Sequence, residues 1–427
     1  MKLIQKCKKA FKVIGPGMIT GAADDDPSGI ATYTQAGAKF GYGQLWTIIF
    51  MLPLMTAVQE ACARIGAVTG SGLAAVIKKH YSQKVLFTAV ALILIANTIN
   101  IGTDIGVMAE ALRLIVPINF SILALAITAI ILILEIFLSY KIYSRFLKWC
   151  VLSLIAYPLT VFLVSNPWPE IFKATFIPHL EFNFAFLFII VGVFGTTISP
   201  YMFFWQASAE VEEEKCHHLW SHGQPRPDKK FISNLRLDNF LGMLFSQVAA
   251  WSIIVVAGTV LHNSGTVDIK TAADAARALE PLVNTFPNAG LLAKIIFTFG
   301  IVGLGLLSVP VLSASASYAV SEAFNWREGL NLKFKKAHGF YGVITVATLI
   351  GLMINYLGLN PIKALIFTAV INGVISVPLL FIINKIAGDK KIMGQYKSGR
   401  LSRAMLWLAF AIMLLSSLAM FAALGKN

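Results

Sequence analysis

Charged residues and cysteines are scarce in this chain. Asp, Glu, Lys and Arg make up only 13% of its 427 residues, whereas 57% are hydrophobic and the mean hydropathy is +0.73. A chain this apolar cannot be one soluble core of that length, which excludes a soluble globular protein. The four cysteines, at positions 7, 62, 150 and 216, have neither disulfide nor metal-ligand spacing, so we expect no disulfide framework.

Long apolar runs occupy the chain instead. Stretches of about 20 residues, the length that crosses a bilayer as a helix, recur along it. Because residues 1–12 lead straight into the first stretch, we expect no cleavable signal peptide. The eleven runs are residues 13–37, 45–67, 86–114, 119–139, 145–165, 183–209, 238–261, 288–318, 340–357, 361–384 and 403–424. We predict an all-α integral membrane protein with eleven spans, in which residues 1–427 form a single polytopic domain.

Acidic residues are scarcer than basic ones, 21 against 35, which gives a net charge of +14. The basic residues do not form one patch for a nucleic acid. They cluster in every second connection, at Lys2 to Lys12, Lys78 to Lys84, Lys141 to Lys148, Lys215 to Arg236, Arg327 to Lys336 and Lys385 to Arg403. The positive-inside rule therefore predicts a cytoplasmic N-terminus and, with eleven spans, a C-terminus outside.

Carboxylates and helix breakers interrupt the first apolar run, at Asp24-Asp25-Asp26-Pro27-Ser28-Gly29. A carboxylate near the bilayer centre costs about 2.5–3.5 kcal/mol, so it normally faces an ion, a partner or water. Pro27 removes a backbone donor and Gly29 lets the chain leave helical geometry, which frees carbonyl oxygens beside the acidic side chains. This combination is typical of a cation site.

The sixth run is interrupted in the corresponding place, at Gly195-Thr196-Thr197-Ile198-Ser199-Pro200-Tyr201. Paired interruptions indicate inverted repeats that meet at a midplane binding site in a secondary transporter. The alternative is that each proline only kinks a helix. We expect repeat one in residues 1–165, repeat two in 183–387 and an extra span in 402–424.

Further motifs are spread over the whole chain. They are Gly15-Pro16-Gly17, Gln35-Ala36-Gly37-Ala38, Gly41-Tyr42, Ala63-Arg64-Ile65-Gly66-Ala67-Val68-Thr69-Gly70, Gly102-Thr103-Asp104, Val309-Pro310-Val311-Leu312 and Tyr318-Ala319-Val320. Together with the breaks at Pro27 and Pro200, these motifs resemble the NRAMP family of divalent metal transporters. The resemblance implies a LeuT-like fold of two inverted five-helix repeats, spans 1–5 and 6–10, plus span 11. It also implies a metal site between helices 1 and 6, which are unwound at the midplane.

The chain departs from the family pattern at the expected ligands. The family's Asp-Pro-Gly-Asn reads Asp26-Pro27-Ser28-Gly29 here, and its Met-Pro-His reads Ser199-Pro200-Tyr201. Exchanging a thioether for a hydroxyl makes the site harder. Magnesium prefers oxygen ligands and keeps several waters, for which Gly29 and Ser199 leave room. The pattern therefore resembles the NRAMP-related magnesium transporters.

Groups that titrate near neutral pH are missing too. The second family histidine of helix 6 aligns with Gln206, and the acidic residue three positions after Asp104 aligns with Val107. We therefore expect proton coupling to be weak or absent. The cation gradient and the membrane potential would then drive uptake.

The resemblance implies a site built mainly from oxygen atoms. We expect Asp26 to be the direct or water-bridged ligand; the alternative is that it only caps the second half-helix. Other candidates for contact with the ion or its waters are the carbonyls of Ala23 and Thr196 and the residues Ser28, Gly29, Ser199 and Tyr201. Candidates for a vestibule or a supporting role are Asp24, Asp25, Asp104, Gln206 and Asn372.

Several of these residues could have a purely structural role instead. Polar side chains in bundles often hydrogen-bond across helices. Instead of a role near the ion, Asp104 could form a buried ion pair with Arg64. Arg64 could equally pair with Glu60, which lies four residues before it on the same helix. Cys216-His217-His218 with His222 matches no closed zinc site, so we interpret it as a solvated loop.

The function predicted from these observations is import of Mg²⁺, with Mn²⁺ as a second ion, by alternating access. We expect a monomer in a bacterial inner membrane, with the ion and the lipid bilayer as its partners and no cofactor apart from the transported cation. The first alternative is proton-coupled uptake of Mn²⁺ or Fe²⁺. The second is a sodium-coupled amino-acid carrier, which the three aspartates disfavour. A receptor or a membrane enzyme lacks any supporting domain, nucleophile or cofactor motif.

Overall fold

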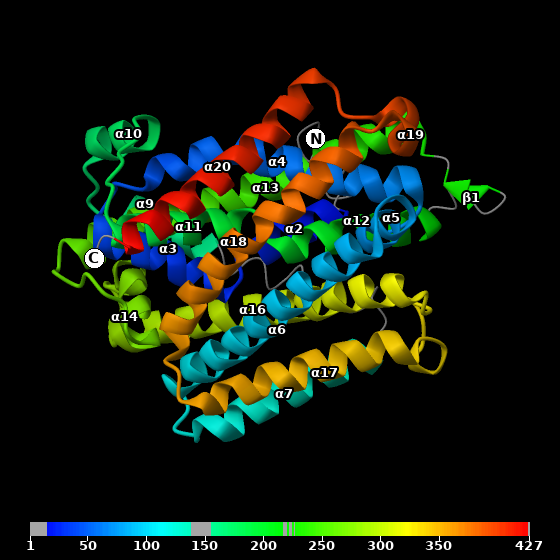
Figure 1. Ribbon diagram of the computed structural model, residues 1–427. Helices are drawn as coiled ribbons and strands as arrows, with labels where there is room; N and C mark the ends of the chain where they lie inside the picture. The colour runs from blue at the N-terminus through cyan, green and yellow to red at the C-terminus, as the bar shows by residue number, and fades with distance from the viewer. Residues whose placement is uncertain (1–14, 138–154, 217–219, 222–223, 226, 426–427) are drawn as a thin grey trace, which may run out of the picture.

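The computed structural model describes residues 15–137, 155–216, 220–221, 224–225 and 227–425. Apart from a hairpin of two short strands, β1 (Trp220–Ser221) and β2 (Gln224–Pro225), the regular structure of this part is helical. The long helices form one bundle, with α2 and α3 in its interior and α7 and α17 together at one edge (Figure 1).

Nine helices of the described residues are long and apolar enough to cross a membrane, with α11 and α12 counted as one. They are α4 (Leu45–Thr69), α6 (Gln83–Arg113), α7 (Phe120–Phe137), α11 (Phe184–Thr197) with α12 (Pro200–Cys216), α13 (Lys229–Ala257) with its π-helical end Gly258–His262, α16 (Ala289–Phe324), α17 (His338–Ile354), α18 (Pro361–Gly388) and α20 (Arg400–Leu424). The first interrupted run forms two shorter helices, α2 (Pro16–Asp24) and α3 (Pro27–Phe40). Residues 145–154 of the run at 145–165 lie outside the described residues, and α9 (Ala156–Leu163) forms the helix in the rest of that run.

Several long helices extend beyond their apolar runs, α13 and α16 among them. We expected a span at 238–261, but α13 begins at Lys229, where Asp228 caps the helix by accepting a hydrogen bond from the backbone N–H of Phe231, at 2.6 Å. Lys and Arg form helix well, so the basic segment continues the helix outside the apolar stretch. At the other end of the 288–318 run, α16 continues to Phe324 and stops at Asn325, which adopts the left-handed conformation.

Short helices that the apolar pattern did not predict connect the long ones. The structure contains α5 (Leu73–His80), α10 (Trp168–Phe176), α14 (Ala272–Ala276), α15 (Glu280–Val283), α19 (Lys390–Met393) and 3₁₀ turns at Arg277–Leu279, Phe334–Lys336, Asn355–Leu357 and Gly394–Tyr396. They are too short to cross a bilayer.

Helices that carry the interruptions pack backbone to backbone. A Cβ atom added to Gly21 of α2 would lie 2.2 Å from the carbonyl oxygen of Gly242 in α13, and one added to Gly195 of α11 would lie 2.0 Å from that of Ala369 in α18. Small residues at such contacts are the usual means of bringing membrane helices close. α2 is therefore held directly against the backbone of α13, and α11 against that of α18.

The N-terminus of α2 is fixed by a carboxylate from α13. The backbone N–H groups of Gly15 and Gly17 donate to the two oxygens of Asp238, at 2.9 and 2.7 Å. An anion at this position satisfies otherwise unpaired N–H groups and matches the positive end of the helix dipole. The Gly15-Pro16-Gly17 motif thus lies against Asp238.

Arg64 pairs within its own helix. Its guanidinium donates to both oxygens of Glu60, each at 2.9 Å, and to the hydroxyl of Ser398 and the carbonyl of Tyr396. Asp104 accepts instead from the hydroxyl of Ser308, at 2.8 Å. The intrahelical alternative is confirmed, and the pairing of Asp104 with Arg64 is wrong.

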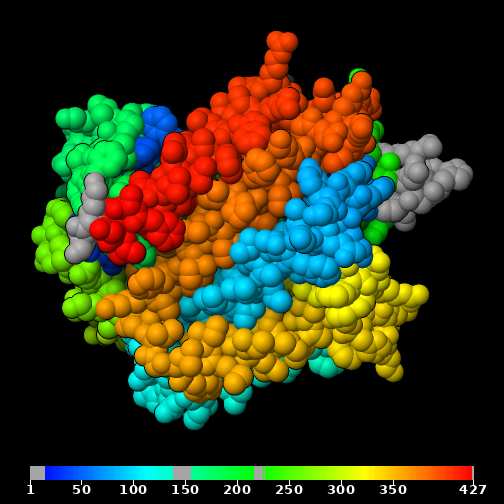
Figure 2. Space-filling view, viewed as in Figure 1, coloured from blue at the N-terminus to red at the C-terminus, as the bar shows by residue number. Residues whose placement is uncertain are grey.

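The outer surface of the bundle is apolar over its long helices. Figure 2 shows α6, α17, α18 and α20 side by side on one face. These helices expose large hydrophobic side chains, among them Phe87, Met353, Phe367, Leu415 and Phe421. An exposed apolar area of this kind fits the contact with lipid that the composition predicted.

Candidate cation site

The two interruptions have the same backbone design. Asp24 ends α2, Asp25 and Asp26 leave helical geometry, and Pro27 begins α3. Likewise Thr197 ends α11, Ile198 and Ser199 leave it, and Pro200 begins α12. Proline is well placed at the first position of a helix, because its missing N–H would have no partner there anyway. Both predicted breaks are confirmed, and neither is a simple kink.

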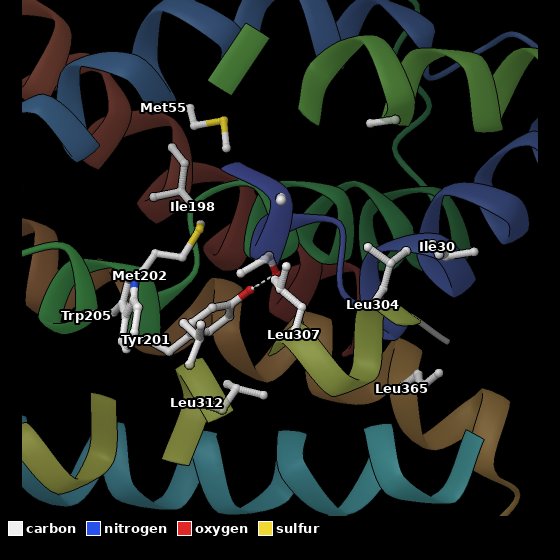
Figure 3. Close-up of a cluster of buried hydrophobic side chains, with 14 of the residues drawn as sticks. Ile30, Met55, Ile198, Tyr201, Met202, Trp205, Leu304, Leu307, Leu312 and Leu365 are labelled. Carbon is white, nitrogen blue, oxygen red and sulfur yellow. Dashed lines mark hydrogen bonds between the residues drawn. The ribbon is translucent and has the colours of Figure 1, made fainter. Parts of the chain in front are cut away.

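Hydrogen bonds join the two interruptions. The hydroxyl of Tyr201, at the start of α12, donates to the carbonyl oxygen of Ala23 in α2, at 2.6 Å (Figure 3). The hydroxyl of Thr196 in α11 donates to that of Tyr33 in α3, at 3.0 Å. The carbonyl of Ala23, a candidate ligand, therefore accepts a hydrogen bond from a second candidate residue, Tyr201.

Asp26 lies at the start of α3 with its carboxylate buried. One oxygen accepts from the backbone N–H of Gly29, at 2.8 Å, and from the hydroxyl of Ser28. The other accepts from the side-chain amide of Asn100 in α6, at 3.4 Å. Asp26 thus caps the N-terminus of α3, which is the role we gave as the alternative to a ligand, and it also faces a polar group of α6.

The other two aspartates of the run are less well satisfied. The hydroxyl of Ser246 in α13 donates to one oxygen of Asp24. The second oxygen of Asp24 and both oxygens of Asp25 have no hydrogen-bond partner, although both residues are completely buried. Unpaired buried carboxylates are costly, which makes this region suited to a cation.

Asp104 adds a fourth buried carboxylate. One of its oxygens accepts from Ser308 in α16, and the other has no partner. Asp104 lies close enough to Asp26 for their charges to repel. Within the described part of the chain, none of the four aspartates forms a salt bridge with Lys, Arg or His.

The second interruption supplies neutral groups. The hydroxyl of Ser199 donates to the carbonyls of Gly195 and Thr196, at 2.6 and 2.8 Å, so it is turned toward its own helix. Gln206 accepts from Thr20 and donates to Glu210, at 2.9 Å. Asn372 of α18 is 1% exposed, and its amide nitrogen has no partner.

The space expected beside Gly29 is filled in this conformation. An added Cβ atom would lie 3.2 Å from the carbonyl oxygen of Asp24 and 3.3 Å from the ring of Tyr33. In the described ranges, no three His, Cys, Asp or Glu side chains form a ready-made metal cluster. A cation held here would need hydroxyl, amide or carbonyl oxygens, or its own waters, besides carboxylates.

Several residues around the interruptions were not predicted. Tyr33, Ser246 and Ser308 contact the predicted residues Thr196, Asp24 and Asp104, respectively, and Figure 3 shows the thioethers of Met55 and Met202 in the same buried cluster as Tyr201. A tyrosine or serine in an apolar helix gives no sign of what it will face. Met202 could have been considered, because it lies three residues after Ser199, where the family has its methionine.

The fold defines the class of the protein. A manganese transporter from Eremococcus coleocola, solved with an aromatic bis-isothiourea compound, superposes with a TM-score of 0.69 at 19% identity, over 95% of this chain and 85% of that one. MhsT in complex with L-phenylalanine superposes with a TM-score of 0.63 at 12% identity, over 95% and 98%. The chain has the LeuT-type fold of membrane transporters, as expected.

The family follows from the sequence. The model of the Nramp family, described as natural resistance-associated macrophage protein-like, matches residues 17–423, so the chain belongs to this family. Proteins named divalent metal cation transporter MntH are similar to it. The one from Ralstonia nicotianae is 25% identical over 426 residues, covering 96% of this chain and 90% of the relative; the one from Klebsiella pneumoniae (strain 342) is 26% identical over 414 residues, covering 95% and 92%.

Proposed function

We propose that this protein imports a divalent cation by alternating access, with Mg²⁺ as the preferred ion and Mn²⁺ as the second. One observation carries the proposal: Asp24, Asp25, Asp26 and Asp104 are buried at the first helix interruption without a basic partner in the described residues. Carboxylates in such a place mark ion pathways. The MntH names of the relatives support a divalent metal as the ion.

The donor atoms favour a hard cation. We assign Asp26 as the carboxylate ligand, with the carbonyls of Ala23 and Thr196 and the side chains of Ser28, Ser199 and Tyr201 as partners of the ion or its waters. All of these donors are oxygen atoms, which magnesium prefers, and magnesium keeps several waters. To bind the ion, Tyr201 would release Ala23, and the hydroxyl of Ser199 would turn away from its own helix.

Two observations favour the second candidate, proton-coupled uptake of manganese. Met202 places a thioether beside Tyr201, and thioethers suit softer metals. Gln206, which stands in place of a family histidine, donates to the buried carboxylate of Glu210. We keep the uncoupled mechanism as the first candidate, since neither Tyr201 nor Gln206 titrates near neutral pH.

Orientation and setting belong to the same proposal. We place the N-terminus in the cytoplasm of a bacterial cell and the monomer in the inner membrane, with residues 1–165 and 183–387 as the two repeats and 402–424 as the extra span. A potential that is negative inside would then pull a divalent cation in with about 4.6 kcal/mol per 100 mV, twice the value for one charge. The activity is transport and involves no catalytic residue.

The deciding experiment is uptake into proteoliposomes. Mg²⁺ and Mn²⁺ would be compared at equal membrane potential, with the internal pH recorded in the same vesicles and Asp26→Ala as the inactive control. We expect Mg²⁺ influx that depends on Asp26 and leaves the internal pH unchanged. Influx of Mn²⁺ alone, with acidification, would establish the second candidate instead. Influx of neither ion would refute divalent cation transport.

A further inference from the structure

The polar groups at the first interruption sort onto two sides. Asp26 faces Asn100 of α6, and Asp104, one turn further along α6, faces Ser308 of α16. Asp24, by contrast, accepts its hydrogen bond from Ser246 of α13. The α6/α16 side and the α13 side are thus lined by different helices, and each has its own carboxylates.

The α13 side holds more negative charge than its hydrogen bonds satisfy. Asp24 and Asp25 are 0% exposed, and three of their four carboxylate oxygens have no hydrogen-bond partner. Asp24 lies close enough to Asp25, and Asp25 to Asp26, for their charges to repel, and the hydroxyl of Ser246 lies beside both Asp24 and Asp25. The tyrosine ring of Tyr33 is near both charges as well, but it carries no positive charge.

We propose that Asp24, Asp25 and Ser246 form a second cation site, next to the site at Asp26 but on the α13 side of the interruption. The three free oxygens would be the ligands, and the Ser246 hydroxyl would turn its oxygen toward the ion. Two carboxylates match the charge of a divalent ion, whereas a monovalent ion would leave one negative charge buried without compensation. The ligand class is therefore a hard divalent cation.

The second site deepens the proposed function and rests on it. An ion between α2 and α13 neutralises Asp24 and Asp25 while another ion enters or leaves at Asp26. It also adds a link between these two helices close to the interruption, where Gly21 and Gly242 already touch. The protein would bind two divalent ions per chain.

The test counts bound ions on the purified full chain. Mn²⁺ is the probe, because the electron paramagnetic resonance signal of free Mn²⁺ falls as the ion binds. We expect two Mn²⁺ per chain in the wild type, one in Asp25→Asn and one in Asp26→Asn. A single Mn²⁺ in the wild type, or two in Asp25→Asn, would overturn the second site.

A second variant tests the site with less risk of misfolding. Ser246→Ala keeps every charge and should weaken the second Mn²⁺ by about tenfold, the effect of losing one contact of about 1.4 kcal/mol. Ser308→Ala is the matched control on the α6/α16 side and should leave the affinity of the second Mn²⁺ unchanged. Equal weakening of the second ion in both variants would contradict a site on the α13 side.

Uptake measured on the same preparation separates the two proposals. If the wild type transports Mg²⁺ or Mn²⁺ but binds one Mn²⁺, the second site is wrong and the proposed function stands. If it neither binds Mn²⁺ nor transports either ion, the proposed function itself is wrong.

Discussion

The two helix interruptions have the same backbone and opposite chemistry. Each leaves two residues outside helical geometry and restarts the helix on a proline, at Pro27 and at Pro200. The first contains Asp25 and Asp26, whereas the second contains Ile198 and Ser199. In both, a glycine about one turn earlier lies against a carbonyl of a neighbouring helix.

This difference shows that breaking the helix and supplying charge depend on different residues. Proline and close glycine packing produce the break in either half, whatever the neighbouring side chains are. The negative charge comes from the first interruption and from Asp104 of α6, while the second interruption contributes hydroxyl and carbonyl groups. Changes that remove charge should therefore act on the ion, and changes that disturb the packing should act on the fold.

The largest effect should come from Asp26→Asn. Asparagine caps a helix about as well as aspartate, so α3 should form normally while the ligand charge is lost. Even groups that only support a ligand change affinity by about 10- to 100-fold, so we expect initial Mg²⁺ uptake to fall by more than about 100-fold. Uptake close to the wild-type rate would mean that Asp26 is only a cap.

The close glycine packing can be disrupted at both interruptions in the same way. Gly21→Ala and Gly195→Ala should each destabilise the fold by about 1–3 kcal/mol or more, because the new methyl group would meet a carbonyl oxygen. Thermal unfolding in detergent measures this. Gly300→Ala is the control, since a Cβ atom there meets nothing within 4 Å, and it should unfold at or slightly above the wild-type temperature.

Ser199→Met tests the chemistry of the second interruption. A thioether favours softer ions, so the ratio of Mn²⁺ to Mg²⁺ uptake should rise by about tenfold, or 1.4 kcal/mol. Competition between the two ions in proteoliposomes gives this ratio. Ser199→Ala removes the same hydroxyl without adding sulfur, and a similar rise in that variant would show that the sulfur is not responsible.

Tyr201→Phe removes the bond between the interruptions. The carbonyl of Ala23 would lose its partner, at a cost of about 1 kcal/mol, which corresponds to about fivefold in an equilibrium constant. We expect this change in the concentration of half-maximal uptake, with the selectivity between ions preserved. Tyr33→Phe, which acts on the Thr196 contact, should give an effect of similar size.

The smallest effect concerns the far ends of the two half-helices. The N-terminus of α2 is held by Asp238, whereas Glu212 near the C-terminus of α12 accepts from the hydroxyl of Tyr318 and the backbone N–H of Leu330, beside Glu328 in the loop after α16. Burial, and then the charge of Glu322, raise the pKa of Glu328 above its ordinary value. At neutral pH the folded protein thus keeps a proton that the unfolded chain has already released.

Stability from this proton is complete below the ordinary pKa of glutamate and is lost as the pH rises toward the folded value. Glu328→Gln should therefore reduce the fall in unfolding temperature between about pH 5 and pH 8. Differential scanning calorimetry of both proteins tests this, and an unchanged pH dependence would contradict it.

Much of the fold could be predicted from the sequence, since apolar length and proline position are local signals. The breaks at Pro27 and Pro200 are confirmed for this reason. The start of α13 was misplaced because Lys229 and Arg236 continue a helix outside the apolar run, and α5 and α10 were missed because they are short.

The site was predictable only where charge appears in an unusual place. Asp24, Asp25 and Asp26 stand out in an apolar run, but the partners of Asp24 and Asp104 do not. Ser246 and Ser308 are two of many serines in apolar helices, and only the packing of α13 and α16 selects them. The same holds for Arg64, whose choice of Glu60 over Asp104 depends on the distance between helices.

The cap on α2 has a mechanical consequence. With nine residues, α2 is a rod about 14 Å long, fixed at its start by Asp238 and jointed at its end by Asp25. A rod that pivots at its joint moves most at the far end, so a tilt of α2 would displace Gly15 by several times the shift at Ala23. One carboxylate, more than two hundred positions away in the chain, thus restrains that motion at the end that moves most, together with the packing of Gly21 on Gly242.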